Sequence, residues 1–136
     1  MFLEKNPELK GKPATTEEIE NIEKELKINL NKDYKEFISR FGGAYAGIDI
    51  YGWSNASVLG VNTVIDLTIK FRKEFEESEF HDEVNRSLVF SDDGSGNPIV
   101  ISDRGEIVIY YHDSGEKEIL SESLGDFIKE NFVGWD

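Results

Sequence analysis

The hydrophobic pattern of residues 88–120 predicts a series of antiparallel strands. Apolar runs rich in β-branched and aromatic residues, at 88–90, 99–101 and 107–111, alternate with clusters of Gly, Asp, Asn, Ser and Pro. Such alternation is typical of short strands joined by tight turns. An earlier run, 48–51, alternates apolar and polar side chains with a period of two and predicts one more strand.

Two helices are predicted before these strands. The first covers residues 15–27, because Thr15 and Glu18 form a capping-box pattern ahead of an apolar stripe. Asn31 is placed to cap the second helix, and the glycine pair after Phe41 is placed to end it. An aromatic stripe on the second helix is assigned to the core; it consists of Tyr34, Phe37, Ile38 and Phe41.

Two later helices are predicted after Asn62 and after Ser123. The third helix would bury a face made of Val61, Val64, Ile65, Thr68, Phe71 and Phe75. Its far end, 74–83, has six acids and no Lys or Arg, which opposes the helix dipole, so we expect it to fray into a solvated loop. The last helix would bury Leu124, Phe127, Ile128 and Phe132, before a tail that ends in an exposable Trp135.

Together these elements predict an α+β fold. Its central antiparallel sheet would hold the 88–120 meander plus the earlier strand, flanked by about four helices. A length of 136 residues is typical of one domain, 1–136, with residues 1–14 as an extended lead-in. Trp53 follows the earlier strand in a turn-like break, and it either packs into the core, which we favour, or is exposed for a partner.

Composition narrows the functional classes. The chain has no cysteine, which excludes disulfides, thiolate zinc sites and a cysteine nucleophile. The N-terminus lacks a signal-peptide pattern and no apolar run is long enough to span a membrane, so we expect a soluble cytoplasmic protein without membrane contact. Residues 1–73 carry 11 basic and 11 acidic side chains, whereas 74–136 carry 4 and 17. The acidic half disfavours nucleic-acid binding and would attract a basic protein, unless its charge serves solubility alone.

The sequence lacks recognised catalytic and metal-binding motifs. The loop 91–98 fails the calcium-loop spacing, lacks a lysine and a following helix for phosphate, and fits a turn between strands. The two histidines, His81 and His112, belong to no recognised catalytic motif, although His112 adjoins Asp113 and Ser114. We therefore expect no enzyme activity, no catalytic residues, no metal and no cofactor.

Three stretches together resemble the SMI1/KNR4 domain of the SUKH superfamily. They are the Glu-rich first helix leading to Leu30-Asn31-x-Asp33-Tyr34 and Phe41-Gly42-Gly43, the run 90–98 with Val108-x-Tyr110-Tyr111-His112-Asp113, and Ser123-Leu124-x-x-Phe127-Ile128. Asn31 stands where the family typically has proline, a conservative change at a helix start. The resemblance implies an α+β domain without catalytic residues, and for many bacterial members an immunity protein that neutralises a cognate toxin, often a nuclease.

The predicted partner is therefore a basic protein toxin; the alternative is a general regulatory or scaffold module without a toxin partner. From charge and expected exposure, we predict partner contacts in the meander turns, together with Trp53 outside them; the turn residues are Asp92, Asp93, Asp103, Glu106 and Asp113.

Overall fold

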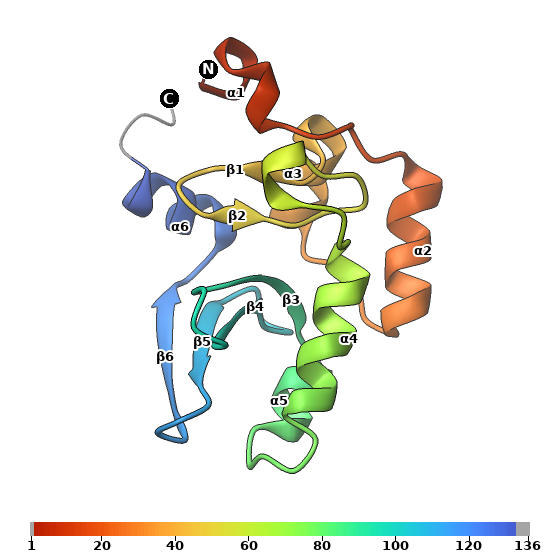
Figure 1. Cartoon of the computed structure of the whole chain (residues 1–136). Helices are drawn as coiled ribbons and strands as arrows, with labels where there is room; N and C mark the ends of the chain where they lie inside the picture. Colours follow the sequence, from red (N-terminus) through yellow and green to blue (C-terminus); the bar gives the residue numbers. More distant parts are fainter. Residues whose placement is uncertain (1, 133–136) are drawn as a thin grey trace.

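The computed structural model describes residues 2–132, and Trp135 of the predicted tail lies outside them. Figure 1 shows its helices and strands. The helical elements are α1 (Phe2–Lys5), η1 (Pro7–Leu9), α2 (Thr16–Leu26), α3 (Lys32–Phe41), η2 (Ser57–Leu59), α4 (Val64–Glu74), α5 (His81–Asn85) and α6 (Leu124–Asn131). The strands are β1 (Ala44–Tyr45), β2 (Asp49–Ile50), β3 (Leu88–Asp92), β4 (Pro98–Ile101), β5 (Ile107–Tyr111) and β6 (Glu116–Ser121).

Side-chain caps start the four longer helices. The predicted capping box of α2 is present, with Thr15 and Glu18 each accepting from the other's backbone N–H. Asn31 caps α3 by accepting from Asp33 N, and Ser123 caps α6 in the same way. Gly42 ends α3 at a φ of +63°, which glycine adopts without strain.

The predicted cap of the third long helix was wrong by one residue. Thr63, not Asn62, caps α4, because Thr63 and Asp66 form a reciprocal capping box. Val61 therefore lies before the helix and is 96% exposed, while Leu67 takes a place in the buried face. As predicted, the acidic stretch does not continue α4, which ends at Glu74, although a short α5 follows.

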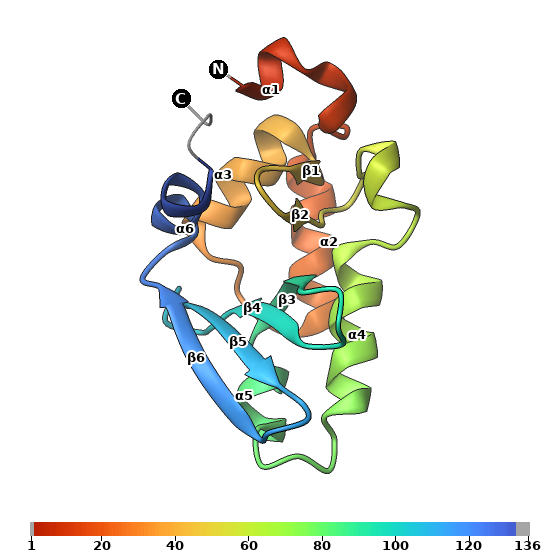
Figure 2. The ribbon, with the colours of Figure 1, turned by 60° about the vertical axis from the view of Figure 1, so that its left-hand side comes forward.

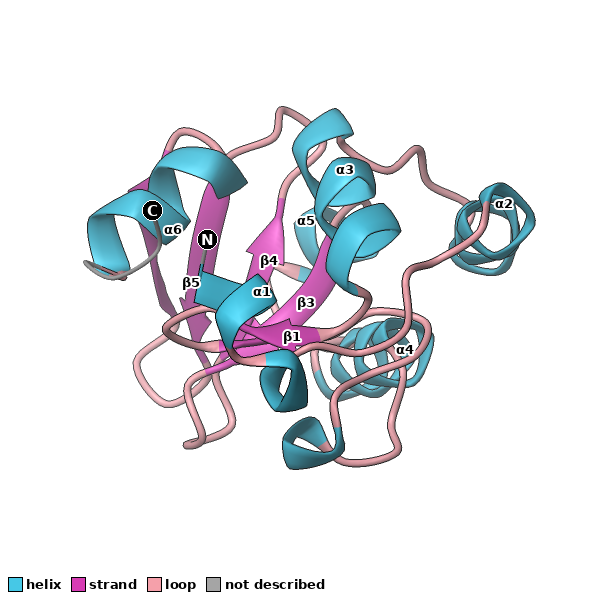
Figure 3. Cartoon of the chain, turned by 90° about the horizontal axis from the view of Figure 1, so that it is seen from above, coloured by secondary structure: helices cyan, strands magenta, loops and turns pink. Residues whose placement is uncertain are grey.

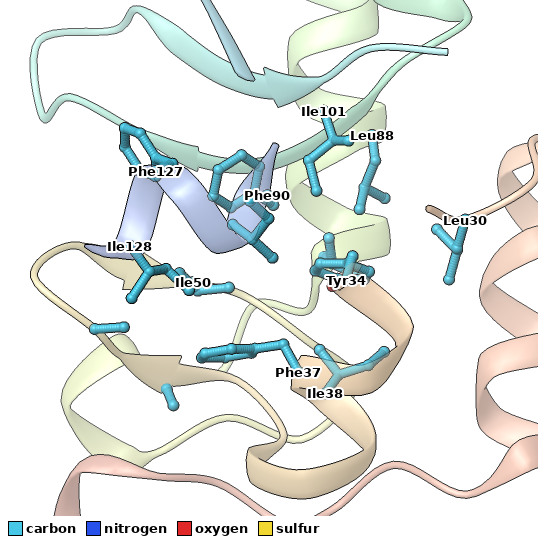
Figure 4. Close-up of a cluster of buried hydrophobic side chains, with 14 of the residues drawn as sticks. Leu30, Tyr34, Phe37, Ile38, Ile50, Leu88, Phe90, Ile101, Phe127 and Ile128 are labelled. Carbon is cyan, nitrogen blue, oxygen red and sulfur yellow. The ribbon is translucent and has the colours of Figure 1, made fainter. Parts of the chain in front are cut away.

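The meander forms a four-stranded antiparallel sheet in the order β3-β4-β5-β6. In its first three strands, residues 88–90, 99–101 and 107–110 are buried because both faces of the sheet are covered. One face packs against α3, α6 and the β1–β2 ribbon in the larger core cluster, whose central side chains appear in Figure 4. The other face packs against α4 and α5 through a second cluster. Figure 2 and the view from above in Figure 3 show the helices around the sheet.

The earlier strand does not belong to the central sheet, in contrast to the prediction. β2 pairs with β1 in a separate two-stranded ribbon. A hydrogen bond from Tyr51 N to Phe90 O (2.9 Å) joins the residue after β2 to β3. Tyr34 anchors the same residue, since its buried hydroxyl donates to Tyr51 O at 2.6 Å. The local pattern predicts a strand, but only tertiary contacts select its partner.

The N-terminal segment is not extended over its whole length, in contrast to the prediction. Residues 2–9 form α1 and η1, and six α-helices in all lie within residues 2–132. Leu3 is fully buried in the core, which orders this end of the chain. Asn6 holds α1 in place by donating from its side chain to Phe2 O, and Pro7 sits at the first position of η1, where its missing N–H is not needed.

Candidate partner-binding surface

The loop between β3 and β4 is a turn, as predicted, and two of its own carboxylates hold it. Asp92 Oδ1 accepts from Gly94 N at 2.7 Å. Asp93 accepts from the backbone of Ser95 and from both the backbone and the side chain of Asn97. Although desolvation acts to raise it, these hydrogen bonds hold the pKa of Asp93 below its usual value. The carboxylate therefore stays charged and keeps the turn rigid at neutral pH.

Asn97 joins this turn to the turn between β5 and β6. Its Oδ1 lies 3.0 Å from the backbone N of His112, which donates to it, and 2.6 Å from His112 Nδ1. The imidazole passes so close that a Cβ on Gly96 would lie 3.2 Å from its Cε1, and Gly96 also has a φ of +88°. In an antiparallel meander the first and third turns lie at the same end of the sheet, and this contact locks them together.

Carboxylates gather around the two joined turns. Asp113 is highly exposed, with 92% of its side chain accessible and His112 Nε2 3.0 Å away. Tyr111 donates a hydrogen bond to Glu118, which raises the pKa of Tyr111, and the charges of Asp93 and Glu116 act in the same direction. A carboxylate oxygen of Glu79, from the α4–α5 loop, lies 3.6 Å from where a Cβ on Gly115 would be. We call these six carboxylates the acidic turn surface: Glu79, Asp92, Asp93, Asp113, Glu116 and Glu118.

Asp49 on β2 adds a carboxylate beside this surface. Burial raises the pKa of Asp49, and the negative charge of Asp92 raises it further. The pKa of Tyr51 is raised by burial and by the same two carboxylates. Asp49 and Tyr51 therefore both lie within reach of the charge of Asp92 at the end of β3.

The predicted contact residues do not form one patch. Asp92, Asp93 and Asp113 share the acidic turn surface, but Asp103 and Glu106 lie in the β4–β5 turn at the opposite end of the sheet, because successive turns of a meander alternate between ends. There Asp103 pairs with Arg86 at 3.6 Å. Trp53 is half-buried and packs against the larger core cluster, as favoured from the sequence.

The sequence reasoning also missed contributors to this surface. Glu79 belongs to a charge run that we interpreted as a solvated loop, and Asp49 lies far away in the chain. The sequence does indicate that Glu116 and Glu118 lie on the same face of the sheet, since alternate residues of a strand share a face. The pairing of Glu116 with Tyr111, and of Glu118 with Ile109, places them on the sheet face that carries the larger core cluster. Lys117 pairs with Tyr110 and is directed to the other face, where its Nζ binds Glu83 at 2.5 Å.

The residues that the structure describes assemble no metal centre. Among residues 2–132, no three His, Asp or Glu side chains are placed to hold a metal ion together. His112 is engaged by Asn97 and Asp113, and His81 pairs with Asn85 at 3.1 Å. Within the same residues, the helices are too short or too polar to cross a bilayer.

A protein-family comparison agrees with this architecture. The model of the SMI1 / KNR4 family (SUKH-1) matches residues 13–130. The chain belongs to the SMI1/KNR4 family. In this SMI1/KNR4 protein, the aromatic stripe of α3 is buried core, and the run 90–98 forms the end of β3 and the turn that carries Asp92 and Asp93. A search of curated proteins found no match to the chain.

Proposed function

We propose that this SMI1/KNR4 protein is a non-enzymatic binding protein, and specifically a cytoplasmic immunity protein that neutralises a basic protein toxin. The observation that carries the proposal is the acidic turn surface. Carboxylates from three separate segments meet there, while the cation within β6, Lys117, is turned away to Glu83. A surface of one sign attracts a partner of the opposite sign and speeds its association.

The arrangement suits a nuclease toxin in particular. A nuclease binds phosphates with Lys and Arg side chains, and carboxylates on a rigid turn can occupy the positions of those phosphates. Rigidity supports the proposal, because the carboxylates of Asp92 and Asp93 are held by hydrogen bonds within the turn, so less conformational entropy is lost on binding.

The structure changes the choice of test variants. Replacing Asp92 and Asp93 with lysine would disrupt the turn, because their carboxylates accept hydrogen bonds from Gly94, Ser95 and Asn97. Asp113→Lys is the better variant, since the carboxylate of Asp113 is almost fully exposed and pairs with the neighbouring His112. Glu25→Lys on α2 is a matched control, with the same charge change on an exposed position of the neutral half.

The first experiment co-expresses the protein with the product of the neighbouring open reading frame and measures survival. An immunity protein rescues growth, Asp113→Lys rescues less, and Glu25→Lys rescues fully. In binding kinetics, Asp113→Lys and added salt both slow association. If no neighbouring product is toxic and a pull-down from the host instead returns several partners of modest affinity, the alternative of a general interaction module replaces the proposal.

A further inference from the structure

The two edge strands of the central sheet, β3 and β6, differ in whether other elements cover their backbone. The β3 edge is covered: Thr68 of α4 accepts from Val89 N and donates to Val89 O, both at 3.1 Å, and Tyr51 N donates to Phe90 O. Thr68 is fully buried, so these contacts shield the backbone of β3 from solvent and from other chains.

The β6 edge is open. β6 is the last strand in the sheet order and runs along the outer margin of the molecule in Figures 1 and 2. Within residues 2–132, no backbone hydrogen bond joins the outer side of β6 to another element. Residues 116–119 are exposed, including Ile119 at 56%. An exposed edge presents backbone donors and acceptors that can pair with one more strand.

The side chains of β6 disfavour one pairing with a second copy, the register centred on Lys117. In an antiparallel pair of identical strands related by a two-fold axis, side chains that face each other must lie on the same face of the sheet. The register centred on Lys117 therefore places Glu116 opposite Glu118 of the other copy, and Lys117 opposite Lys117. Like charges directly opposite each other destabilise such a pair, whereas opposite charges stabilise it.

We propose that the outer edge of β6 binds an extended basic segment of a protein partner, which adds to the sheet as a fifth strand. The inference rests on the proposed function, because it specifies how the basic partner docks. Lys or Arg at alternate positions of the added strand would face Glu116 and Glu118, and the apolar residues between them would face Ile119 on the opposite side. The strand would lie directly beside the acidic turn surface, to which Glu116 and Glu118 belong.

The test uses the full-length protein and a synthetic peptide of alternating lysine and valine, with hydrogen exchange followed residue by residue by NMR. With about nine-tenths of the protein bound, the outward-facing amides of β6 exchange about tenfold more slowly. A peptide with the same residues in two blocks, all lysines and then all valines, gives no protection. Glu116→Lys/Glu118→Lys abolishes the protection, whereas Glu20→Lys/Glu25→Lys retains it; circular dichroism checks that both variants are folded.

Three results would overturn the inference. These are no slowing of β6 amides at peptide concentrations of about 1 mM, equal slowing with both peptides, or a free protein that is already dimeric with β6 protected, which would make a second copy the occupant. The immunity proposal is judged separately by toxin rescue. Rescue without protection of the β6 amides would support the immunity function and rule out docking at β6. Peptide binding at β6 without rescue would support the docking mode and rule out the immunity function.

Discussion

Thr68 provides the most demanding test of how the fold protects its sheet. This side chain lies on the buried face of α4, and its hydroxyl is within 3.1 Å of both the backbone N and the backbone O of Val89. Val89 belongs to β3, an edge strand, so its outward N–H and C=O have no neighbouring strand to pair with. One hydroxyl therefore satisfies two buried backbone groups, and Thr68→Val would leave both without a partner while keeping the side chain's shape.

The expected loss of stability follows from those two groups. An unsatisfied buried donor or acceptor costs about 1–3 kcal/mol, so the pair costs roughly 4 kcal/mol. The extra methyl of valine returns about 1 kcal/mol through apolar burial. The free energy of unfolding should therefore fall by about 3 kcal/mol. Thr68→Ser keeps the hydroxyl and loses one buried methyl, which should lower it by only about 1 kcal/mol.

Urea denaturation followed by circular dichroism distinguishes the two variants. With a slope of about 1.5 kcal/mol/M, the midpoint of Thr68→Val should fall by roughly 2 M at an unchanged slope. Thr68→Ser should fall by less than half of that. If Thr68→Val were as stable as Thr68→Ser, or more stable, the hydroxyl would not be sealing the β3 edge.

Three further predictions concern the charged end of the sheet. Asn97→Ala should lower the free energy of unfolding by about 1 kcal/mol and speed amide exchange in the β5–β6 turn, because the two turns lose their link; unchanged exchange would contradict this. Asp92→Asn should lower the pKa of Asp49 in an NMR titration, although burial, the larger cause, keeps it above its ordinary value. The raised pKa means that Asp49 contributes stability below its unfolded pKa and loses it as pH rises through the folded pKa. The hydrogen bond from Lys117 lowers the pKa of Glu83. This carboxyl therefore contributes stability at pH values above its unfolded pKa of about 4.3. The contribution is lost as pH falls through the folded pKa. Lys117→Met should raise the pKa of Glu83 and make unfolding in urea less sensitive to acid over that range; an unchanged titration would show that the ion pair does not hold the carboxylate.

Local patterns predicted most of the secondary structure because the deciding interactions span only a few residues. The capping box of α2 and the cap of α3 join neighbours in the chain, and the meander's apolar runs are separated by residues that favour turns. The cap of α4 was missed although its signal is local: Asn62 and Thr63 are both good caps, and Asp66 three residues after Thr63 decides between them.

The composition of the binding surface was only partly predictable. The negative charge of the C-terminal half and the exposure of Asp113 follow from sequence, and so does the prediction of a protein partner. The sequence does not show which carboxylates lie close together in space. Asp103, like Asp113, is an aspartate in a turn of the meander. It lies at the opposite end of the sheet because each strand reverses the direction of the chain, so successive turns alternate between the two ends.

The sequence by itself determined the four longer helices, the strands of the meander and the negative charge of the second half, since these depend on residue identity and short spacings. Only the tertiary structure decided that β2 pairs outside the central sheet, that Asn97 reaches His112, and that Thr68 closes one sheet edge while β6 stays open. These contacts join residues far apart in the chain, and their geometry depends on how both faces of the sheet are filled. The surface that we propose for partner binding is therefore a product of packing, built from charges that the sequence supplies.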